Sequence, residues 1–116
     1  MADETSASYP TDWLTLPDAA ELLGTGISGV RRLLEDSALV SSKRDGVQRI
    51  PSAFFLDGEP LSSLRGTIIA LSDAGLDADE SIDWLFEIEQ TLGNAPIESL
   101  RAGRKSEVRR AARVIF

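Results

Sequence analysis

Residues 16–35, LPDAAELLGTGISGVRRLLE, constrain the fold more than any other part of the chain. Two helices that cross at a steep angle need a small residue at the crossing, a turn residue that tolerates positive φ, and a branched apolar residue facing back. Ala20, Gly24 and Val30 supply these three roles. We therefore predict a helix-turn-helix. Its further buried positions are Leu23, Ile27 and Leu33.

The ends of the two helices follow from local signals. Thr15 supplies a hydroxyl cap, Pro17 suits a first helical turn, and Asp18 lies near the positive end of the helix dipole. Gly24 is a helix-stopping residue, so the first helix is expected to end there. Apolar residues at three- and four-residue spacing then predict a second helix over residues 28–36.

A short β-hairpin is expected directly after the second helix. Residues 39–42 and 47–50 are extended runs, and Asp45-Gly46 between them is a strong hairpin signal. Pro51 places the second strand at an edge or ends it. Residues 54–56 are also expected to be extended, with a turn over residues 57–60.

The rest of the chain is predicted to be helical. The expected helices cover residues 62–73, residues 77 or 79 to 92, residues 94–103 and residues 105–115, with Asp77 and Glu80 as a capping box. Two apolar stripes are assigned to the core; they are Ile82, Trp84, Leu85 and Ile88, and Val108, Ala111, Ala112 and Ile115. The pattern leaves open whether part of this surface forms a homodimer contact.

Together these elements predict the fold class. It is mainly α with a small β-hairpin wing, a winged helix-turn-helix followed by C-terminal helices.

Composition narrows the function classes. The chain has 116 residues, the size of one domain, and contains no Cys and no His. Cysteine nucleophiles, histidine bases and thiolate or imidazole zinc sites are therefore excluded. We expect no enzymatic activity, no cofactor and no metal. Since no apolar run approaches the length of a membrane span, and the first residues do not resemble a secretory signal, we expect a cytoplasmic protein without a membrane partner.

Charge is segregated along the chain, although the net charge is −7. Residues 1–23 carry acids and no bases, and residues 51–100 carry ten acids and one arginine. Residues 24–50 and 101–116 are instead net basic. The two basic segments allow one face to meet a polyanion. The alternative is that the acidic middle pairs with the basic C-terminal segment inside the molecule.

The helix-turn-helix and the wing predict a double-stranded DNA interface. Side chains expected to lie outside the core on the second helix are Ser28, Gly29, Arg31 and Arg32, and those on the wing are Lys43, Arg44, Gln48 and Arg49. Arginines at the start of a recognition helix reach guanine edges or phosphates, and a wing contacts the backbone or minor groove. The alternative for Arg31 and Arg32 is ion pairing with Glu35 or Asp36.

Several segments together resemble a known family. The runs LPDAAELLG, RRLLEDSALV, IPSAFF, DWLF and EVRRAARVIF look like the small actinobacterial winged helix-turn-helix DNA-binding regulatory proteins, a family typified by a mycobacterial substrate of a Ser/Thr protein kinase. The resemblance covers residues 13–116, and the first half also resembles excisionase and MerR-type domains. It implies DNA binding without catalysis.

The resemblance also suggests phosphorylation by a Ser/Thr protein kinase. Thr11 and Thr15 lie near the family's target threonine, whereas Trp13 occupies the matching offset. The expected organisation is a flexible acidic tail over residues 1–12, a winged helix-turn-helix over 13–60, and a helical part over 61–116 on the same core.

These features predict a sequence-specific DNA-binding protein that acts as a transcriptional regulator. The alternative is a protein-interaction module in which the winged helix is degenerate and the acidic middle region binds a partner.

Two other motifs are not interpreted as binding sites. Residues 24–29 match G-x-G-x-x-G, but a helical pattern rather than a strand precedes them. A calcium loop starting at Asp77 would have isoleucine at its sixth and twelfth positions.

Overall fold

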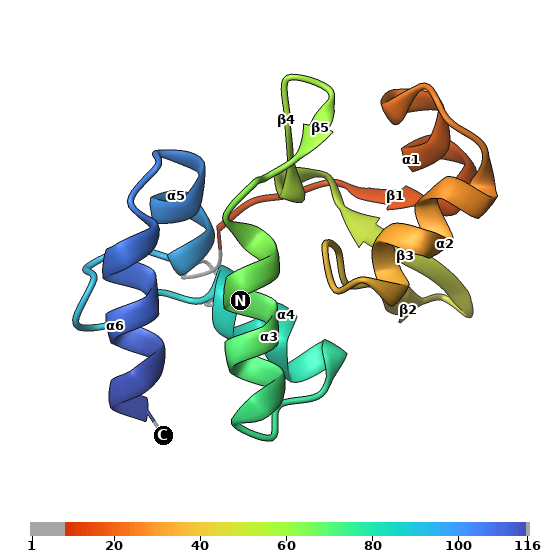
Figure 1. Cartoon of the computed structure of the whole chain (residues 1–116). Helices are drawn as coiled ribbons and strands as arrows, with labels where there is room; N and C mark the ends of the chain where they lie inside the picture. Colours follow the sequence, from red (N-terminus) through yellow and green to blue (C-terminus); the bar gives the residue numbers. More distant parts are fainter. Residues whose placement is uncertain (1–8, 116) are drawn as a thin grey trace.

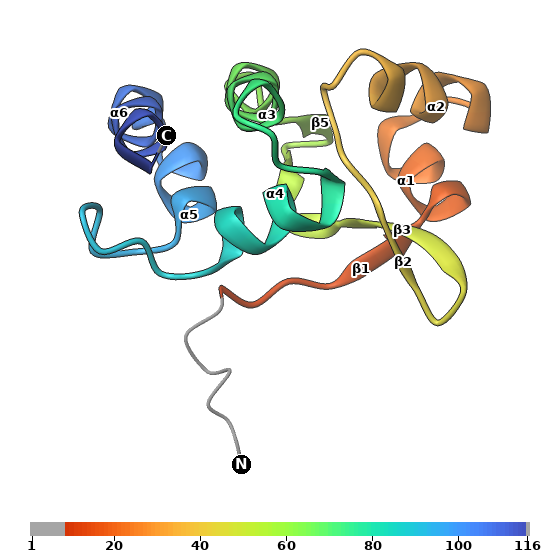
Figure 2. The ribbon, with the colours of Figure 1, turned by 90° about the horizontal axis from the view of Figure 1, so that it is seen from below.

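The computed structural model describes residues 9–115. In chain order its elements are β1 (Trp13–Thr15), α1 (Leu16–Leu23), α2 (Ile27–Glu35), β2 (Ser42–Arg44), β3 (Val47–Pro51), the 3₁₀ turn η2 (Ser52–Phe54), β4 (Phe55–Leu56), β5 (Glu59–Pro60), α3 (Leu64–Asp73), α4 (Ala78–Phe86), α5 (Pro96–Arg101) and α6 (Lys105–Ile115). The α2 helix and the β2–β3 hairpin lie at one end of the molecule and α6 at the other, with α3 between them (Figures 1 and 2). The fold class is therefore as predicted.

The helix-turn-helix forms as expected. The Thr15 hydroxyl accepts from the Asp18 backbone N–H at 3.2 Å, and the Asp18 carboxylate accepts from the Thr15 backbone N–H at 3.4 Å, which completes a capping box. Gly24 ends α1 with φ of 71°. Val30 is fully buried, but Ile27 is 40% exposed. The prediction that Ile27 is buried is wrong, because it lies at the open first turn of α2.

The wing belongs to a three-stranded antiparallel sheet. Its order is β1-β3-β2, with Thr15 and Ser42 both in register with Arg49. The predicted turn is confirmed. Asp45 and Gly46 have φ of 56° and 77°, the left-handed geometry that suits a tight hairpin. The first wing strand begins at Ser42 rather than at residue 39, and β1 was not predicted. Because β1 pairs with a strand far along the chain, no local signal announces it.

The segment after the sheet forms a second, smaller hairpin. Residues 52–54 form a 3₁₀ turn that includes Phe54, the first residue of the extended run predicted over residues 54–56, and β4 then pairs with β5 around the turn at Asp57-Gly58. The prediction that Phe54 is extended is therefore wrong. Phe54 is fully buried, and its ring centroid lies 5.6 Å from that of Phe86 on α4. A turn at this point directs the aromatic ring into the core.

The C-terminal half contains the four predicted helices, but α4 ends early. It stops at Phe86 rather than at residue 92, and Glu87 has extended dihedral angles. The Glu89 carboxylate accepts from the backbone N–H groups of Thr91 and Leu92, which holds the following loop. Ile88 consequently lies outside any helix and is 55% exposed, so its assignment to the core is wrong. The side chain of Ile115 lies outside the described part of the chain.

Residues 9–12 contact the folded body, although the sequence suggests a flexible tail over residues 1–12. The Tyr9 N–H donates to the Phe86 carbonyl at 2.7 Å, and the Thr11 hydroxyl accepts from the Ala53 N–H at 3.0 Å. These hydrogen bonds continue the path of β1 towards α4. Residues 1–8 of the expected tail lie outside the described residues.

One hydrophobic core joins the two halves. Buried residues from α1 and α2 belong to the same cluster as those from α3 to α6. Arg101 on α5 strengthens the connection, since its guanidinium donates to the carbonyls of Ala53 and Phe55 at 2.8 and 2.6 Å. The C-terminal helices therefore hold the segment that directly follows the wing.

Candidate nucleic-acid interface

The outer side of α2 presents two cations. Arg31 and Arg32 are exposed, as is Ser28 one turn before them. None of the ion pairs in the described part of the chain involves either arginine, and Asp36 pairs with Arg65 instead. The alternative that Arg31 and Arg32 are paired with Glu35 or Asp36 is therefore not observed. Both guanidinium groups remain available to an anionic partner.

The N-terminal turn of α2 is also open. Gly26 caps it without a side-chain hydrogen bond, so the first backbone N–H groups receive no side-chain cap at the positive end of the helix dipole. Gly29 has a different environment from Ser28. A Cβ atom at Gly29 would overlap the Thr25 hydroxyl, so a side chain there would require the exposed Thr25 side chain to move. The place of Gly29 at the interface stays a prediction.

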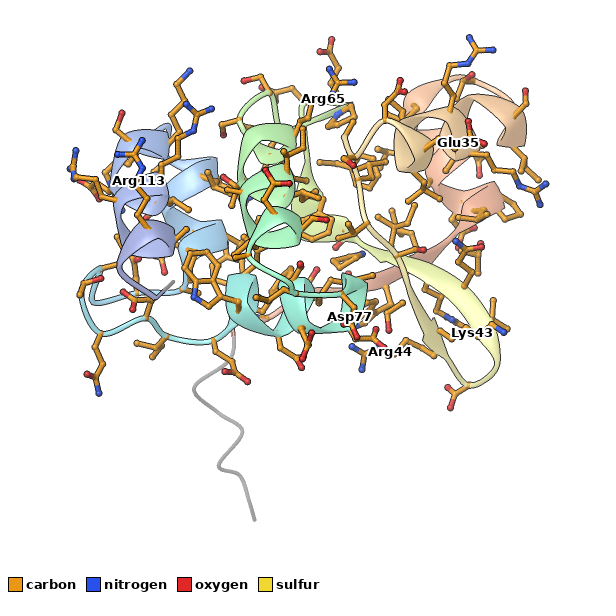
Figure 3. The ribbon with its side chains drawn as sticks, turned by 60° about the horizontal axis from the view of Figure 1, so that its bottom comes forward. Glu35, Lys43, Arg44, Arg65, Asp77 and Arg113 are labelled. Atoms are coloured by element: carbon orange, nitrogen blue, oxygen red, sulfur yellow. The ribbon has the colours of Figure 1, made fainter. Side chains whose placement is uncertain are left out.

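The two cations at the end of β2 point in different directions. Lys43 lies on the outer side of the hairpin, whereas Arg44 lies on the side that faces α4 (Figure 3). The Arg44 guanidinium carbon is 4.0 Å from the centroid of the Trp13 ring, a cation–π contact. Arg44 also lines a shallow pocket with Asp83 of α4 and with Glu87, which directly follows that helix. Lys43, in contrast to Arg44, has no cation–π contact among the described residues.

Gln48 and Arg49 on β3 also differ from each other. Gln48 is exposed, and its amide N–H donates to the Ser41 hydroxyl at 2.7 Å. Arg49 is half-buried between its neighbours in the sheet, Thr15 and Ser42. Its Nε is buried without a hydrogen-bond partner. Since part of the Arg49 side chain is packed in the sheet, only its outer end is accessible to a ligand.

The structure therefore gathers the predicted residues at one end of the molecule but gives them unequal access. Ser28, Arg31 and Arg32 on α2 and Lys43 on the hairpin are exposed. Figures 1 and 2 show that these two elements share the same end. A helix beside a hairpin, each with exposed cations, suits a duplex whose major groove takes the helix while the hairpin meets the backbone.

Comparisons with known proteins cover both halves of the chain. Residues 5–55 match the family model described as "DNA-binding protein Rv2175c, wHTH domain", and residues 61–115 match the "Rv2175c C-terminal domain of unknown function". The DNA-binding protein Rv2175c of Mycobacterium tuberculosis (strain ATCC 25618 / H37Rv) is 34% identical over 113 residues, which cover 86% of this chain and 77% of the relative. The chain belongs to the Rv2175c family.

The known fold of the Rv2175c family agrees with the structure. The NMR structure of Rv2175c superposes with a TM-score of 0.80 and 32% sequence identity, covering 99% of this chain and 87% of that one. The resemblance inferred from the sequence is thus confirmed.

Two side chains at this end were not predicted from sequence. Trp13 holds Arg44, and Arg65 of α3 reaches the end of α2, where its Nε donates to the Asp36 carbonyl at 3.0 Å and its guanidinium pairs with the Asp36 carboxylate at 3.7 Å. Neither pair has a fixed spacing along the chain. The sequence shows that Arg65 and Asp36 have opposite charges. Many other acids could pair with Arg65 on that ground, so the charges alone do not identify its partner.

The two threonines considered as kinase targets have structural roles in this member of the Rv2175c family. The Thr15 hydroxyl caps α1, and the Thr11 hydroxyl accepts from the Ala53 N–H and lies 3.3 Å from the Ser52 hydroxyl. A phosphate at either position has to displace these hydrogen bonds.

The acidic middle segment forms no ion pair with the basic C-terminal segment in the described part of the chain. The ion pairs within residues 9–115 join Arg65 to Asp36 and Arg104 to Glu107. Neither connects an acid of residues 51–100 with a base of residues 101–113. The alternative of internal pairing between these segments is therefore not observed in the described part of the molecule.

Three further observations concern a metal site, a dinucleotide site and a membrane span. Within residues 9–115, no three carboxylates gather in a group that could hold a metal ion. Residues 24–29, which match a dinucleotide motif, follow the helix α1 rather than a strand. None of the helices in the described region is long and apolar enough to cross a membrane.

Proposed function

We propose that this chain is a sequence-specific DNA-binding protein and acts as a transcriptional regulator in the cytoplasm. The observation that carries the proposal is the exposed pair Arg31 and Arg32 on α2, beside a hairpin with exposed Lys43, in a family whose relative is named a DNA-binding protein. The domains proposed for this function remain residues 13–60 for DNA contact and 61–116 for support of the fold.

The roles of the individual residues follow from their placement. We assign Arg31 and Arg32 to base edges in the major groove, because two donors in a planar fork discriminate guanine. Ser28 is assigned to a phosphate or base contact near the open first turn of α2. Lys43 is assigned to the phosphate backbone, which it meets as a point charge. Arg44, Gln48 and Arg49 are assigned to weaker contacts, since each is already engaged or partly buried in the fold.

The test compares single alanine variants on a duplex selected from random sequences and on a scrambled duplex, at several salt concentrations. Arg31→Ala and Arg32→Ala are each expected to cost about 1–3 kcal/mol on the selected site and to relax discrimination. Lys43→Ala is expected to weaken both duplexes equally and to reduce the salt slope by about one unit. Arg110→Ala, an exposed arginine at the opposite end of the molecule, serves as the control.

Binding of all variants like the parent on both duplexes would show that α2 and the hairpin do not contact DNA. The protein-interaction alternative would then be the better description.

We further propose that a Ser/Thr protein kinase regulates this interface through Thr11 or Thr15. Thr11 and Arg44 line the same shallow pocket, so a phosphate at Thr11 would place negative charge beside the wing. Thr11→Asp is therefore expected to weaken DNA binding. Deletion of residues 2–8 leaves Tyr9 and Thr11, and their hydrogen bonds to the folded body, in place. If Thr11→Asp binds DNA as tightly as Thr11→Asn, phosphorylation at Thr11 does not act through charge.

A further inference from the structure

The end of the molecule opposite α2 carries a stripe of cations on α6. Lys105, Arg109 and Arg113 follow one another at four-residue spacing and are all exposed. Residues four apart lie on one side of a helix, so we call these three residues the basic stripe. The ion pair at the start of this region joins Arg104 to Glu107, outside the stripe.

A row of opposite charge lies on α4 and directly after it. Asp79 and Asp83 lie four residues apart on the helix, Glu87 follows its last residue, Phe86, and all three are exposed. We call them the acidic stripe. None of the ion pairs in the described part of the chain includes a member of either stripe.

The two stripes are complementary in charge. Four residues of helix rise about 6 Å, so the three cations on α6, and Asp79 and Asp83 on α4, are about that far apart along their helices. Like charges at this spacing repel and destabilise a helix. The basic stripe and the Asp79–Asp83 pair therefore carry repulsion that an oppositely charged partner would relieve. Arg44, which lines a pocket with Asp83 and Glu87, offsets part of it at one end of the acidic stripe.

Each stripe also borders apolar surface. Arg109 and Arg113 lie beside a groove between α3 and α6 that is lined by Ala70, Ala74, Ala112 and Asp73. The acidic stripe ends next to Ile88, whose side chain is 55% exposed. The groove has an alanine floor, two arginines and one carboxylate, that of Asp73, so its charge is net positive and it suits an acidic protein surface with an apolar side chain. The phosphate backbone of DNA offers no such apolar group.

We propose that the basic stripe of one copy binds the acidic stripe of a second copy, with Ile88 of the second copy seated in the α3–α6 groove. The two surfaces differ, so the contact is head-to-tail and leaves one free stripe at each end of the assembly. Because α6 lies opposite α2 and the hairpin, it stays accessible when that end contacts DNA (Figures 1 and 2).

The contact is expected to be weak in solution and stronger on DNA. Exposed ion pairs contribute little individually and are screened by salt. Two copies held on one duplex have a high effective concentration for each other, which turns a weak contact into cooperative binding. The cooperative binding on DNA rests on the proposed DNA-binding function, whereas self-association without DNA does not.

The first experiment is sedimentation equilibrium of the full chain without DNA, at protein concentrations up to about 1 mM, where weak contacts are populated. The weight-average mass is expected to rise with concentration in 0.1 M salt and to fall towards the monomer in 1 M salt. Asp83→Asn with Glu87→Gln, and separately Lys105→Gln with Arg113→Gln, are each expected to remain monomeric. Arg110→Gln lies on the α6 side that faces Thr91 and Leu92, and is expected to associate as the parent does.

The decisive sample is an equimolar mixture of the two double variants. One variant retains the basic stripe and the other retains the acidic stripe, so the mixture is expected to form complexes of two chains and none larger. Circular dichroism of each variant confirms that it is folded. A monomeric parent, a monomeric mixture, or double variants that associate like the parent would overturn the proposal.

A duplex long enough for a single copy separates this contact from nucleic-acid binding by α6. The Lys105→Gln/Arg113→Gln variant is expected to bind such a duplex within about twofold of the parent, and to lose cooperativity on a longer one. A tenfold loss on the short duplex, together with a monomeric parent in solution, would assign the basic stripe to DNA and overturn the proposal. Variants of Arg31 and Arg32 test the α2 interface independently.

Discussion

Arg44 and Lys43 are neighbours on one strand, yet they have different physical roles. Arg44 stacks on Trp13 at 4.0 Å, whereas the Lys43 side chain extends away from the sheet. An arginine over an indole ring contributes about 0.5–1 kcal/mol at an exposed site. Arg44 therefore stabilises the attachment of β1 to the wing in addition to supplying charge.

Arg44→Ala is expected to lower the free energy of unfolding by about 0.5–1 kcal/mol because it removes the cation–π contact. Lys43→Ala, which removes the same charge from an exposed position, is expected to leave stability within about 0.5 kcal/mol of the parent. Urea unfolding followed by circular dichroism measures both. Equal unfolding midpoints for the two variants would show that the stacking contributes nothing.

Thr11 anchors the segment before β1 through its hydroxyl. Thr11→Val keeps the shape of the side chain but leaves the Ala53 N–H without its partner at 3.0 Å. A loss of about 1–3 kcal/mol in unfolding free energy is expected, since a partly buried donor is left unsatisfied. Thr11→Ser retains the hydroxyl and serves as the control. A Val variant as stable as the Ser variant would mean that water replaces the bond.

At the scale of elements, the hairpin turn shows how strongly backbone conformation determines the wing. Gly46 has φ of 77°, and a Cβ atom added there would meet no neighbouring atom within 4 Å, so a substitution meets backbone strain and no collision. Gly46→Ala is expected to destabilise the protein by about 1 kcal/mol. Asp45→Asn, at the other turn position with φ of 56°, is expected to be tolerated because asparagine adopts this conformation readily.

Hydrogen exchange of the amides in β2 and β3 measures the local effect of Gly46→Ala. Faster exchange confined to these strands would support strain at the turn. Unchanged exchange throughout the hairpin would contradict it.

At the scale of the whole molecule, Arg101 links the C-terminal helices to the segment after the wing. Its guanidinium donates to two backbone carbonyls that belong to residues 46 and 48 positions earlier in the chain. Charge-assisted hydrogen bonds of this kind contribute about 1.5–3 kcal/mol. The C-terminal part therefore stabilises the winged helix through direct hydrogen bonds.

Arg101→Ala is expected to reduce the unfolding free energy by about 1.5–3 kcal/mol, because it leaves the carbonyls of Ala53 and Phe55 without this donor. Arg104→Ala removes an exposed arginine whose ion pair with Glu107 spans 3.4 Å, and is expected to cost less than about 0.5 kcal/mol. Thermal and urea unfolding of both variants provide the measurement. Similar losses for the two arginines would show that Arg101 acts only as a surface charge.

The sequence by itself determined the features that depend on neighbouring residues. The hydroxyl cap at Thr15, the capping box at Asp77, the stop at Gly24 and the turn at Asp45-Gly46 appear as predicted. The reason is that caps and turns form hydrogen bonds over three or four residues, so residue types at fixed spacing identify them. The family resemblance followed from longer runs of sequence, among them LPDAAELLG and EVRRAARVIF.

Only the tertiary structure decided which residues meet across long separations. It added β1 to the wing sheet, ended α4 at Phe86, stacked Arg44 on Trp13 and turned Arg49 partly into the sheet. Each of these outcomes depends on competition between distant partners for the same surface. Periodicity along the chain records which residues are apolar or charged, but the partner that covers or binds each one is selected when the whole core packs.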